Sequence, residues 1–240
     1  MSFFSTIKNW FSEAPHFEGT ITATERIGSR IQKVTITLPA PVATPFPVGC
    51  YIQAMTSGVV PRAYSVATAD STSFTLLVSF GGRGAGARFF ADAPVGTVVK
   101  CYGPFDDFPY RAGTNRPKIF FATSTGVAPF RRMVEEALNE NLEATLFLGT
   151  PKESDIAFKR DFEELAHSNP HFHFVPVLSA GDQSWQGARG YVTDQVAGKT
   201  ELLRQSDIYI CGVPMMTIGV LNLLKKEGVP ENQIFVQKFG

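Results

Sequence analysis

The chain has 240 residues, of which 44% are hydrophobic, and its 22 basic side chains balance 22 acidic ones. This balance leaves no net field that would attract nucleic acid or an anionic membrane surface. The hydrophobic content excludes global disorder, and the length suffices for one large domain or two ordinary ones.

The N-terminal segment is the first predicted element. No apolar run approaches the ~20 residues that span a bilayer, and the segment lacks the basic start and apolar block of a signal peptide. It does carry apolar side chains on one helical face, namely Phe3, Phe4, Ile7, Trp10 and Phe11. Residues 1–16 are therefore predicted to form a short helix packed on its own domain, with a docking helix for a partner or a membrane surface as the alternative.

Residues 17–113 are rich in short, mostly alternating β-type segments with turn signals between them. The six segments are GTITATERI (19–27), RIQKVTITL (30–38), CYIQAMT (50–56), RAYSVAT (62–68), SFTLLVSF (73–80) and TVVKCYG (97–103). Strands at this spacing predict a small, closed, antiparallel β-barrel. The segment 86–96, GARFFADAPVG, predicts a short helix between the fifth and sixth strands.

Residues 114–240 alternate strands with helices, after a polar connector, RAGTNRP (111–117). The predicted strands are KIFFAT (118–123), EATLFLGT (143–150), HFHFVPVLS (171–179), DIYICG (207–212) and NQIFVQKF (232–239). The predicted helices cover 126–141, 155–169 and 212–228, with a short helix around 191–197. This rhythm predicts a second domain, an α/β doubly wound, parallel five-stranded sheet.

The cysteine and histidine residues indicate the cellular compartment and whether a metal site is expected. Cys50, Cys101 and Cys211 are odd in number and have no paired spacing, which argues against a disulfide framework and favours a reducing compartment. We therefore expect a cytoplasmic protein. Four cysteines for an iron–sulfur cluster are lacking, and the HFH at 171–173 has no acidic pair near it in the sequence, so no metal site is predicted.

The turn after the first α/β strand, FATSTGVAP (121–129), indicates a phosphate site. Gly126 can adopt φ > 0 and lets a ligand approach the backbone. Thr123, Ser124 and Thr125 offer hydroxyl groups, and Pro129 fits the first turn of a helix whose free amides favour an anion. The turn is predicted to bind a pyrophosphate, with a plain strand-to-helix turn as the alternative.

Two further turns should lie beside it, because ligands of such sheets bind at the carboxyl ends of the strands. Gly149 and Thr150 begin GTPKES after the second strand. CGVPMM follows the fourth, with Gly212 in the turn and Pro214 starting the helix. Cys211 would face the same crevice; the alternative is a small buried hydrophobic residue.

The barrel carries its own pair of signals. Arg62 and Tyr64 alternate onto one face of a strand, where a cation for phosphate would stand beside a ring for stacking. GGRGAGA (81–87) places four glycines before a helix and predicts a second backbone anion site. Two anion sites, one in each domain, suggest that two phosphorylated ligands meet between the domains.

The order of these motifs resembles ferredoxin–NAD(P)H reductases and related flavin reductases. The resemblance covers about residues 17–240 and rests on RAYS (62–65), GGRGAGA (81–87), a GPF turn (103–105), TSTGVAPF (123–130) and CGVPMM (211–216). The segment WQGARGYVTD (185–194) is similar to the part that runs past the adenosine end. The resemblance implies a flavin-binding barrel followed by an NAD(P)-binding domain.

Site residues follow from the resemblance by position. It implies that Arg62 and Tyr64 hold and stack on the flavin, and that the two catalytic positions are Ser65, near flavin N5, and Cys211, near nicotinamide C4. The implied cofactor-binding set is Arg62, Ala63, Tyr64, Ser65, Val78, Gly82, Gly84, Ala85, Gly86, Ala87, Thr123, Ser124, Thr125, Gly126, Pro129, Gly149, Thr150, Cys211, Gly212, Pro214, Met215 and Phe239.

The chain departs from the family pattern in places. Ser124 replaces a frequent glycine, Ala85 or Ala87 replaces a serine at the flavin phosphates, and Gln237 replaces a common glutamate. Any aromatic cover over the flavin would have to come from Phe239.

The resemblance implies hydride transfer from NADH or NADPH to a bound flavin, FAD rather than FMN, and onward transfer to a separate acceptor. The acceptor would be a ferredoxin- or flavodoxin-like carrier, an oxygenase component or a small molecule. NADH is slightly favoured, because the basic residues past the second strand (Lys152, Lys159, Arg160) stand among Glu153 and Asp155. The alternative is a non-catalytic flavin- or nucleotide-binding subunit, which Ala85, Ala87 and Gln237 keep open.

Overall fold

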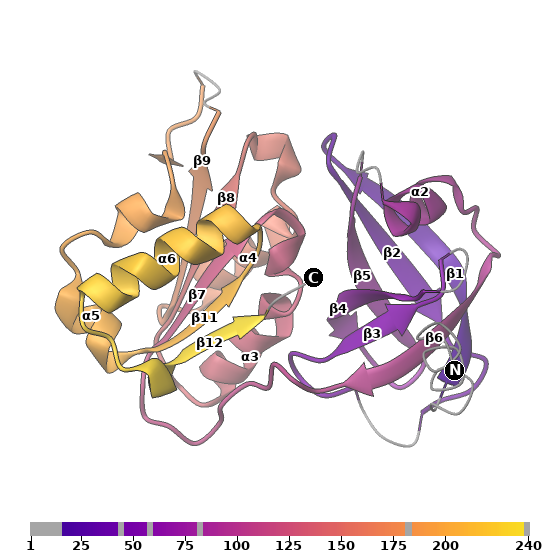
Figure 1. The fold of residues 1–240 in the computed structure, drawn as a ribbon, viewed down its shortest axis with the longest axis horizontal. Helices are drawn as coiled ribbons and strands as arrows, with labels where there is room; N and C mark the ends of the chain where they lie inside the picture. The colour runs from indigo at the N-terminus through magenta and orange to yellow at the C-terminus, as the bar shows by residue number, and fades with distance from the viewer. Residues whose placement is uncertain (1–15, 43–45, 57–59, 81–83, 181–183, 238–240) are drawn as a thin grey trace, which may run out of the picture.

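The computed structural model describes residues 16–42, 46–56, 60–80, 84–180 and 184–237. The chain forms two lobes, a β-barrel built from the first part of the chain and an α/β layered unit built from the rest (Figure 1). Residues 1–15 of the predicted N-terminal helix, together with Gly82 and Phe239, lie outside the described residues, and His16 is the first residue of a strand.

The first lobe is a closed barrel with the strand order β1-β2-β5-β4-β3-β6, and every pairing is antiparallel. Its strands are β1 (His16–Ile27), β2 (Ile31–Thr37), β3 (Tyr51–Ala54), β4 (Arg62–Ala69), β5 (Ser73–Ser79) and β6 (Val98–Phe105). The predicted barrel is confirmed, and helix α2 (Ala85–Asp92) lies between β5 and β6 as expected. The predicted GPF turn is instead the end of β6, where Phe105 pairs with Tyr51.

The second lobe is a parallel sheet with the strand order β10-β9-β8-β7-β11-β12. Its strands are β7 (Lys118–Thr123), β8 (Ala144–Thr150), β9 (Phe172–Leu178), β10 (Ala188–Arg189), β11 (Asp207–Cys211) and β12 (Ile234–Gln237). The predicted count of five strands was wrong, because β10 has only two residues and no periodicity that a sequence pattern could show. Strand order reverses between β7 and β11, so their carboxyl ends form the crevice where such sheets bind ligands.

The helices are α3 (Phe130–Asn139), α4 (Lys159–Ser168), α5 (Thr200–Gln205) and α6 (Pro214–Lys226), with single turns η1 (Ser124–Val127), η2 (Glu153–Asp155), η3 (Val192–Val196) and η4 (Glu231–Gln233). Two predicted starts were early. The helix predicted from residue 126 begins as the 3₁₀ turn η1, and α4 begins only after Phe158, whose φ of 55° interrupts a helix. The short α5 was not predicted.

Strand β7 shows how the layers are built. Ile119 and Phe121 pack in one apolar cluster with residues of α5 and α6, which cover one face of the sheet (Figure 1). Phe120 points to the other face and packs in a second cluster with α3 and α4.

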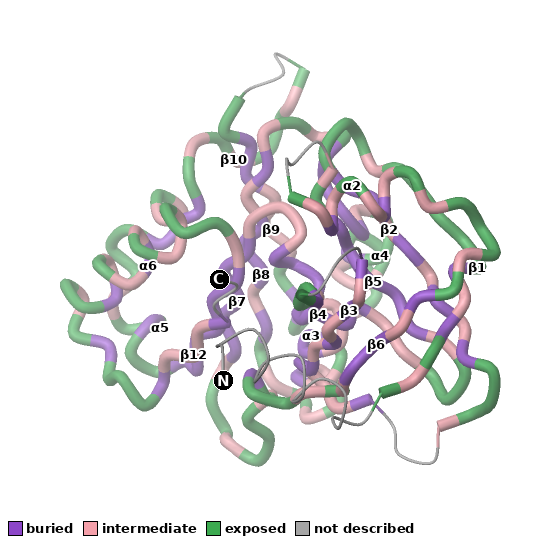
Figure 2. Tube along the Cα trace, turned by 45° about the vertical axis from the view of Figure 1, so that its right-hand side comes forward, coloured by how far each residue is buried: buried purple, intermediate pink, exposed green. Residues whose placement is uncertain are grey.

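That second cluster also contains barrel residues, Ile31, Ala67 and Leu77. The interface between the lobes is therefore an apolar core, and buried chain runs through both lobes (Figure 2). Burial of this kind holds two domains in one arrangement.

The connector between the lobes is fixed to the α/β lobe. The phenol of Tyr110 donates to a Glu140 carboxylate oxygen at 2.8 Å, and the Gly113 N–H donates to the other at 2.9 Å. The Arg111 N–H donates to the Tyr209 hydroxyl at 2.8 Å.

A buried ion pair completes this end of the sheet. Lys118 Nζ lies 2.8 Å from the Asp207 carboxylate, and both side chains are fully buried. Lys118 also donates to Thr114 Oγ1 and to the Arg111 carbonyl. The pair thereby stabilises both the sheet and the connector, while the boundary at residues 113 and 114 stays a prediction.

None of the helices in the described ranges is long and apolar enough to cross a membrane. Within the same ranges no group of three or more His, Cys, Asp or Glu side chains is placed to hold a metal ion.

Candidate functional site

A cavity of about 540 Å³ lies at the edge of the barrel, and we call it the barrel-edge cavity. It is lined by Tyr51, Gln53, Arg62, Ala63, Tyr64, Gly84, Gly86, Ala87, Asp107, Val236 and Gln237. Six of these were predicted as flavin-site residues, and the structure brings them together from β4 and the start of α2. Val236 and Gln237 come from the α/β lobe, so both lobes build this cavity.

Tyr64 has a fixed place in the wall of the barrel-edge cavity. Its ring meets Phe90 edge-on, with ring centroids 5.2 Å apart. A Cβ on Gly86 would lie 2.1 Å from the Tyr64 hydroxyl, so only glycine permits this packing. Burial raises the pKa of Tyr64 to about 12, against the opposing charge of Arg62, and the phenol is therefore protonated at neutral pH.

Gln237 joins the two lobes beside this cavity. Ser65 Oγ donates to Gln237 Oε1 at 2.8 Å, and Cys211 Sγ lies 3.4 Å from the same oxygen. Gln237 Nε2 is buried and has no hydrogen-bond partner within the described part of the chain. A buried donor of this kind is costly unless a ligand accepts its hydrogen bond.

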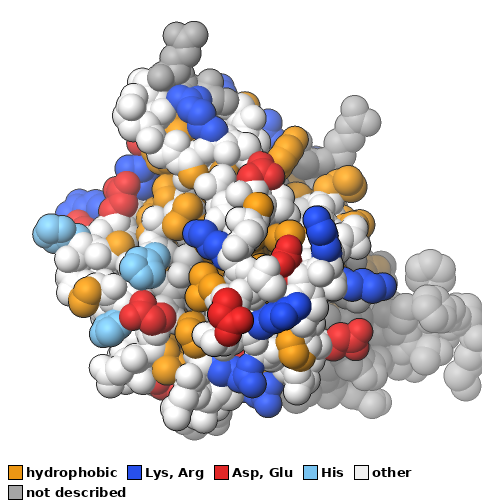
Figure 3. Space-filling model, turned by 90° about the vertical axis from the view of Figure 1, so that its left-hand side faces the viewer, with side chains coloured by type: hydrophobic (Ala, Val, Ile, Leu, Met, Phe, Trp, Pro, Cys, Tyr) orange, Lys and Arg blue, Asp and Glu red, His pale blue; other side chains and the backbone are white. Residues whose placement is uncertain are grey.

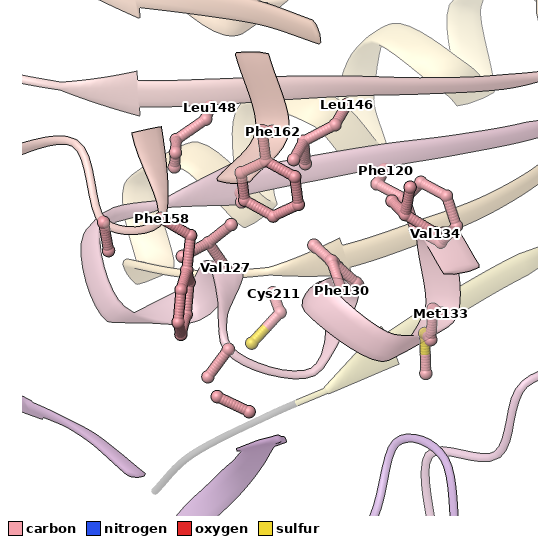
Figure 4. Packing of buried hydrophobic residues seen from close by; sticks show 14 of the residues in the cluster. Phe120, Val127, Phe130, Met133, Val134, Leu146, Leu148, Phe158, Phe162 and Cys211 are labelled. Carbon is pink, nitrogen blue, oxygen red and sulfur yellow. The ribbon is translucent and has the colours of Figure 1, made fainter. Parts of the chain in front are cut away.

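Cys211 ends β11 and is fully buried among apolar side chains such as Val127 and Phe130 (Figure 4). Burial raises the pKa of its thiol to about 12. Cys211 and Ser65 line neither of the two large cavities themselves, but both contact Gln237, which lines the barrel-edge cavity.

A second cavity, of about 700 Å³, lies at the carboxyl edge of the parallel sheet, and we call it the sheet-edge cavity. It is lined by Arg30, Ser79, Phe80, Thr123, Ser124, Gly149, Thr150, Pro151, Ser179, Gly190, Tyr191, Val192, Thr193, Val213, Met215, Met216 and Gly219. Five of these were predicted for the dinucleotide site: Thr123, Ser124, Gly149, Thr150 and Met215. The segment 190–193 was expected from its similarity to the adenosine end.

The turn after β7 differs from its predicted geometry. Positive φ falls on Ser124, at 53°, and Gly126 does not adopt it. Gly126 is needed for close approach instead, since a Cβ there would lie 2.2 Å from the Cys211 carbonyl oxygen. The two predicted ligand turns therefore pack on one another, and Thr123 Oγ1 accepts the Val213 N–H at 2.9 Å.

Several predicted residues lie outside both cavities. Val78 is buried in the barrel core, and Ala85 faces a separate groove with Thr56 and Arg88. Thr125, Gly126, Pro129, Gly212 and Pro214 form the two packed turns and line neither cavity.

Sequence reasoning also missed lining residues. Arg30, Ser79 and Phe80 reach the sheet-edge cavity from the barrel, and Tyr51 and Asp107 line the other cavity. No local motif marks them, because contacts between lobes depend on the tertiary arrangement.

The basic residues past β8 do not line the sheet-edge cavity. Lys159 Nζ contacts Glu163 at 2.6 Å and Glu153 at 3.5 Å, and Arg160 contacts Glu164 at 2.6 Å. Among the described lining residues, the only charge is that of Arg30.

Comparisons with known proteins agree with this arrangement. The profile of the oxidoreductase NAD-binding domain matches residues 120–221. Ferredoxin--NADP reductase B of Sorangium cellulosum (strain So ce56) is 30% identical over 244 residues, which cover 95% of this chain and 99% of that protein. The reductase component DmpP of phenol 2-monooxygenase from Pseudomonas sp. (strain CF600) is 28% identical, over 93% of this chain and 65% of that protein.

A solved structure is also similar, that of the Amycolatopsis cytochrome P450 reductase GcoB. Its TM-score is 0.83 at 26% identity, and the match covers 94% of this chain and 71% of that one. Fold and site together thus define a two-domain, NAD(P)H-dependent flavin oxidoreductase with FAD as its flavin. The chain belongs to the ferredoxin–NAD(P)H reductase family. These findings support an enzyme that passes electrons to a separate acceptor, and not the non-catalytic subunit.

Proposed function

We propose that the barrel-edge cavity holds the flavin, that the sheet-edge cavity holds NAD(P)H, and that hydride passes between them beside Gln237. One observation carries this proposal. Gln237 lines the barrel-edge cavity and contacts Cys211, which directly precedes the turn that enters the sheet-edge cavity. The contact between Gln237 and Cys211 therefore links the wall of one cavity to the turn that enters the other.

The residues of the barrel-edge cavity fit a flavin. Arg62 is exposed and can pair with phosphate, while the protonated Tyr64 offers a ring held by Phe90 and Gly86. The unpartnered Gln237 Nε2 would supply a hydrogen-bond donor to a ligand with acceptor atoms. When bound, the flavin would supply reversible two-electron chemistry, which no side chain of the chain can provide.

Ser65 and Cys211 would act as positioning groups. The Ser65 hydroxyl donates to Gln237 Oε1, and this bond would hold the amide in one orientation beside the cavity that Gln237 lines. The Cys211 thiol remains protonated and neutral at this point. Hydride transfer needs the reacting atoms within roughly 3–3.5 Å and needs water excluded. The apolar contact between the lobes would help to exclude water.

NADH remains the preferred donor in this proposal. A 2′-phosphate calls for a cation of its own, and Arg30 is the single charged side chain among the described lining residues. The Thr123–Ser124 turn would provide uncharged donors, and Tyr191 and Met215 would provide exposed apolar surface for an adenine.

For the acceptor we propose a ferredoxin-like carrier protein or an oxygenase component, because the names of two relatives point to such partners. We propose a cytoplasmic location because the unpaired cysteines favour a reducing compartment. Charges of both signs are mixed over the α/β face that points away from the barrel (Figure 3). This face therefore has no electrostatic potential of one sign that would attract a charged carrier protein. We propose that the carrier docks instead at the barrel-edge side, where the flavin would lie.

The test is anaerobic reduction of the FAD-loaded protein, followed by visible absorbance near ~450 nm as NADH or NADPH is added. We expect rapid bleaching in the wild type, slower bleaching in Ser65→Ala because Gln237 loses its strongest donor, and wild-type rates in the control Ser73→Ala. The Ser73 hydroxyl donates to Asp70 on the barrel surface, and Ser73 lines neither cavity. A bound flavin that neither nucleotide bleaches would contradict the proposal.

A further inference from the structure

The hairpin between β1 and β2 is docked on the α/β lobe. Gly28 has φ 55°, and a Cβ there would lie 2.2 Å from Asp155 Oδ1 and 2.7 Å from the Ser154 carbonyl oxygen. The Ser29 N–H donates to Asp155 Oδ1 at 3.0 Å. The tip of a barrel hairpin is thereby held against η2, directly after the end of β8.

This docking places Arg30 at the sheet-edge cavity. Its Nε lies 4.0 Å from Asp155 Oδ2, while its side chain is 61% exposed. Asp155 is almost fully buried, and its Oδ2 has no hydrogen-bond partner in the described chain. The buried carboxylate attracts the guanidinium through its Nε, and most of the Arg30 side chain stays exposed in the lining of the cavity.

The neighbouring cation on the hairpin is already engaged. The Arg26 guanidinium lies 3.7 Å above the centre of the Phe80 ring. Phe80 in turn donates its N–H to the Arg30 carbonyl at 2.5 Å, which fixes the Arg30 backbone beside Ser79 and Phe80. Arg30 is thus the cation that the hairpin presents to the cavity.

A dinucleotide brings two negative charges in its pyrophosphate, and the turn after β7 offers only neutral donors to them. A planar guanidinium binds phosphate oxygens with two parallel hydrogen bonds. We propose that Arg30, supplied by the barrel, binds the pyrophosphate of the nicotinamide dinucleotide from across the cleft. This inference rests on the proposed function, and it makes dinucleotide binding a link between the two lobes.

The pyrophosphate is the matching group because of where the hairpin docks. Such sheets bind it at the strand-order reversal, which here is the carboxyl end of β7, and Arg30 reaches the cavity that β7 and β8 open into. Pyrophosphate is common to NADH and NADPH. Arg30 therefore contributes affinity for both and selects neither.

The experiment is a calorimetric titration of the FAD-loaded protein with NAD⁺ and with NADP⁺, in the wild type and three variants. Arg30→Gln should raise Kd for both nucleotides by about tenfold, with their ratio unchanged. Arg30→Lys should recover part of the affinity. Arg160→Gln removes the same charge from a side chain outside the cavity and should leave both Kd values unchanged.

The variants also separate this inference from the proposed function. Flavin content and absorbance should be the same in all four proteins, which shows that they fold. Equal Kd values in wild type and Arg30→Gln would overturn the inference alone, as would a loss confined to NADP⁺, which would make Arg30 a reader of the 2′-phosphate. A folded wild type that binds neither nucleotide would overturn the proposed function as well.

Discussion

The two ends of strands β7 and β11 are built from opposite kinds of chemistry. At their amino ends, Lys118 and Asp207 form an ion pair that is fully buried. At their carboxyl ends, Thr123 and Cys211 are uncharged, and the neighbouring Gln237 is neutral where the family commonly has a glutamate.

This difference separates the residues that stabilise the fold from the residues that we place at the site of reaction. Charge that fixes the sheet and the connector is buried at the end that lies away from the barrel-edge and sheet-edge cavities. The other end, where we place hydride transfer, relies on close backbone packing and neutral hydrogen bonds, and its charge comes from the barrel through Arg30. Each end can be tested independently of the other.

The largest effect is expected at the charged end. Lys118→Met would leave the Asp207 carboxylate buried and unpaired, which should lower the free energy of unfolding by about 3–5 kcal/mol. Urea denaturation measures this loss. Flavin reduction by NADH in the folded protein should stay at the wild-type rate, since Lys118 lines neither cavity.

The double variant Lys118→Met with Asp207→Leu is the control. It replaces the pair by apolar side chains and should recover most of the stability. A double variant no more stable than the single one would show that the unpaired charge is not the cause.

At the uncharged end, Gly126→Ala should lower the free energy of unfolding by about 1–3 kcal/mol, because the new methyl group would press on the Cys211 carbonyl and separate the two turns. Thermal unfolding and NAD⁺ titration measure the loss of stability and of affinity. Gly84→Ala is the matched control for stability in thermal unfolding without added FAD, since a Cβ there meets nothing within 4 Å. Equal stability in the two variants would contradict the packing argument.

Protein stability should fall at alkaline pH because the folded protein keeps the Cys211 thiol protonated. Its folded pKa of about 12 exceeds the ordinary value of 9.0, so the thiol's contribution is complete below pH 9 and is lost as pH rises toward 12. From pH 9 to 10, the stability advantage of wild type over Cys211→Ala should shrink by about 1 kcal/mol. Urea unfolding at both pH values measures it, and a constant difference would show that the thiol is not protected.

The smallest expected effect is at Ser124, the residue with positive φ in the β7 turn. Ser124→Gly removes the strain of that conformation but adds freedom to the unfolded chain, so a gain of only about 0.5 kcal/mol is expected. Differential calorimetry would detect a small rise in Tm. A fall in Tm would mean that the Ser124 side chain stabilises the turn more than its backbone strains it.

Most of the fold could be predicted from sequence because its signals are local. Hydrophobic and polar residues alternate along the six barrel strands, and amphipathic helices separate the buried strands of the sheet. The periodicity of the hydrophobic residues therefore predicts both domains. The two-residue β10 and the interruption at Phe158 left no such pattern. The site was predicted less completely, since motifs marked Arg62, Tyr64 and the turns, whereas Arg30 becomes a lining residue only through the docking of a hairpin on Asp155.

Gly126 is a second example of a contact between distant segments that the sequence pattern does not show. Its presence in the turn was recognised, but the reason for it was not, because close approach to the Cys211 carbonyl depends on a strand about 80 residues further along the chain. A sequence pattern can show that a turn contains a glycine. It does not show which distant atoms a larger side chain would contact at that position.

The fixed connector has a consequence for modular use of this chain. Tyr110, Arg111, Gly113 and Thr114 all bond to the α/β lobe, through Glu140, Tyr209 and the Lys118–Asp207 pair. A recombinant α/β module that begins at β7 would lose these bonds. The charges of Lys118 and Asp207 would then be opened to solvent on the side that the connector covers. The natural splice point for domain exchange is therefore upstream of Tyr110, just after β6 ends at Phe105.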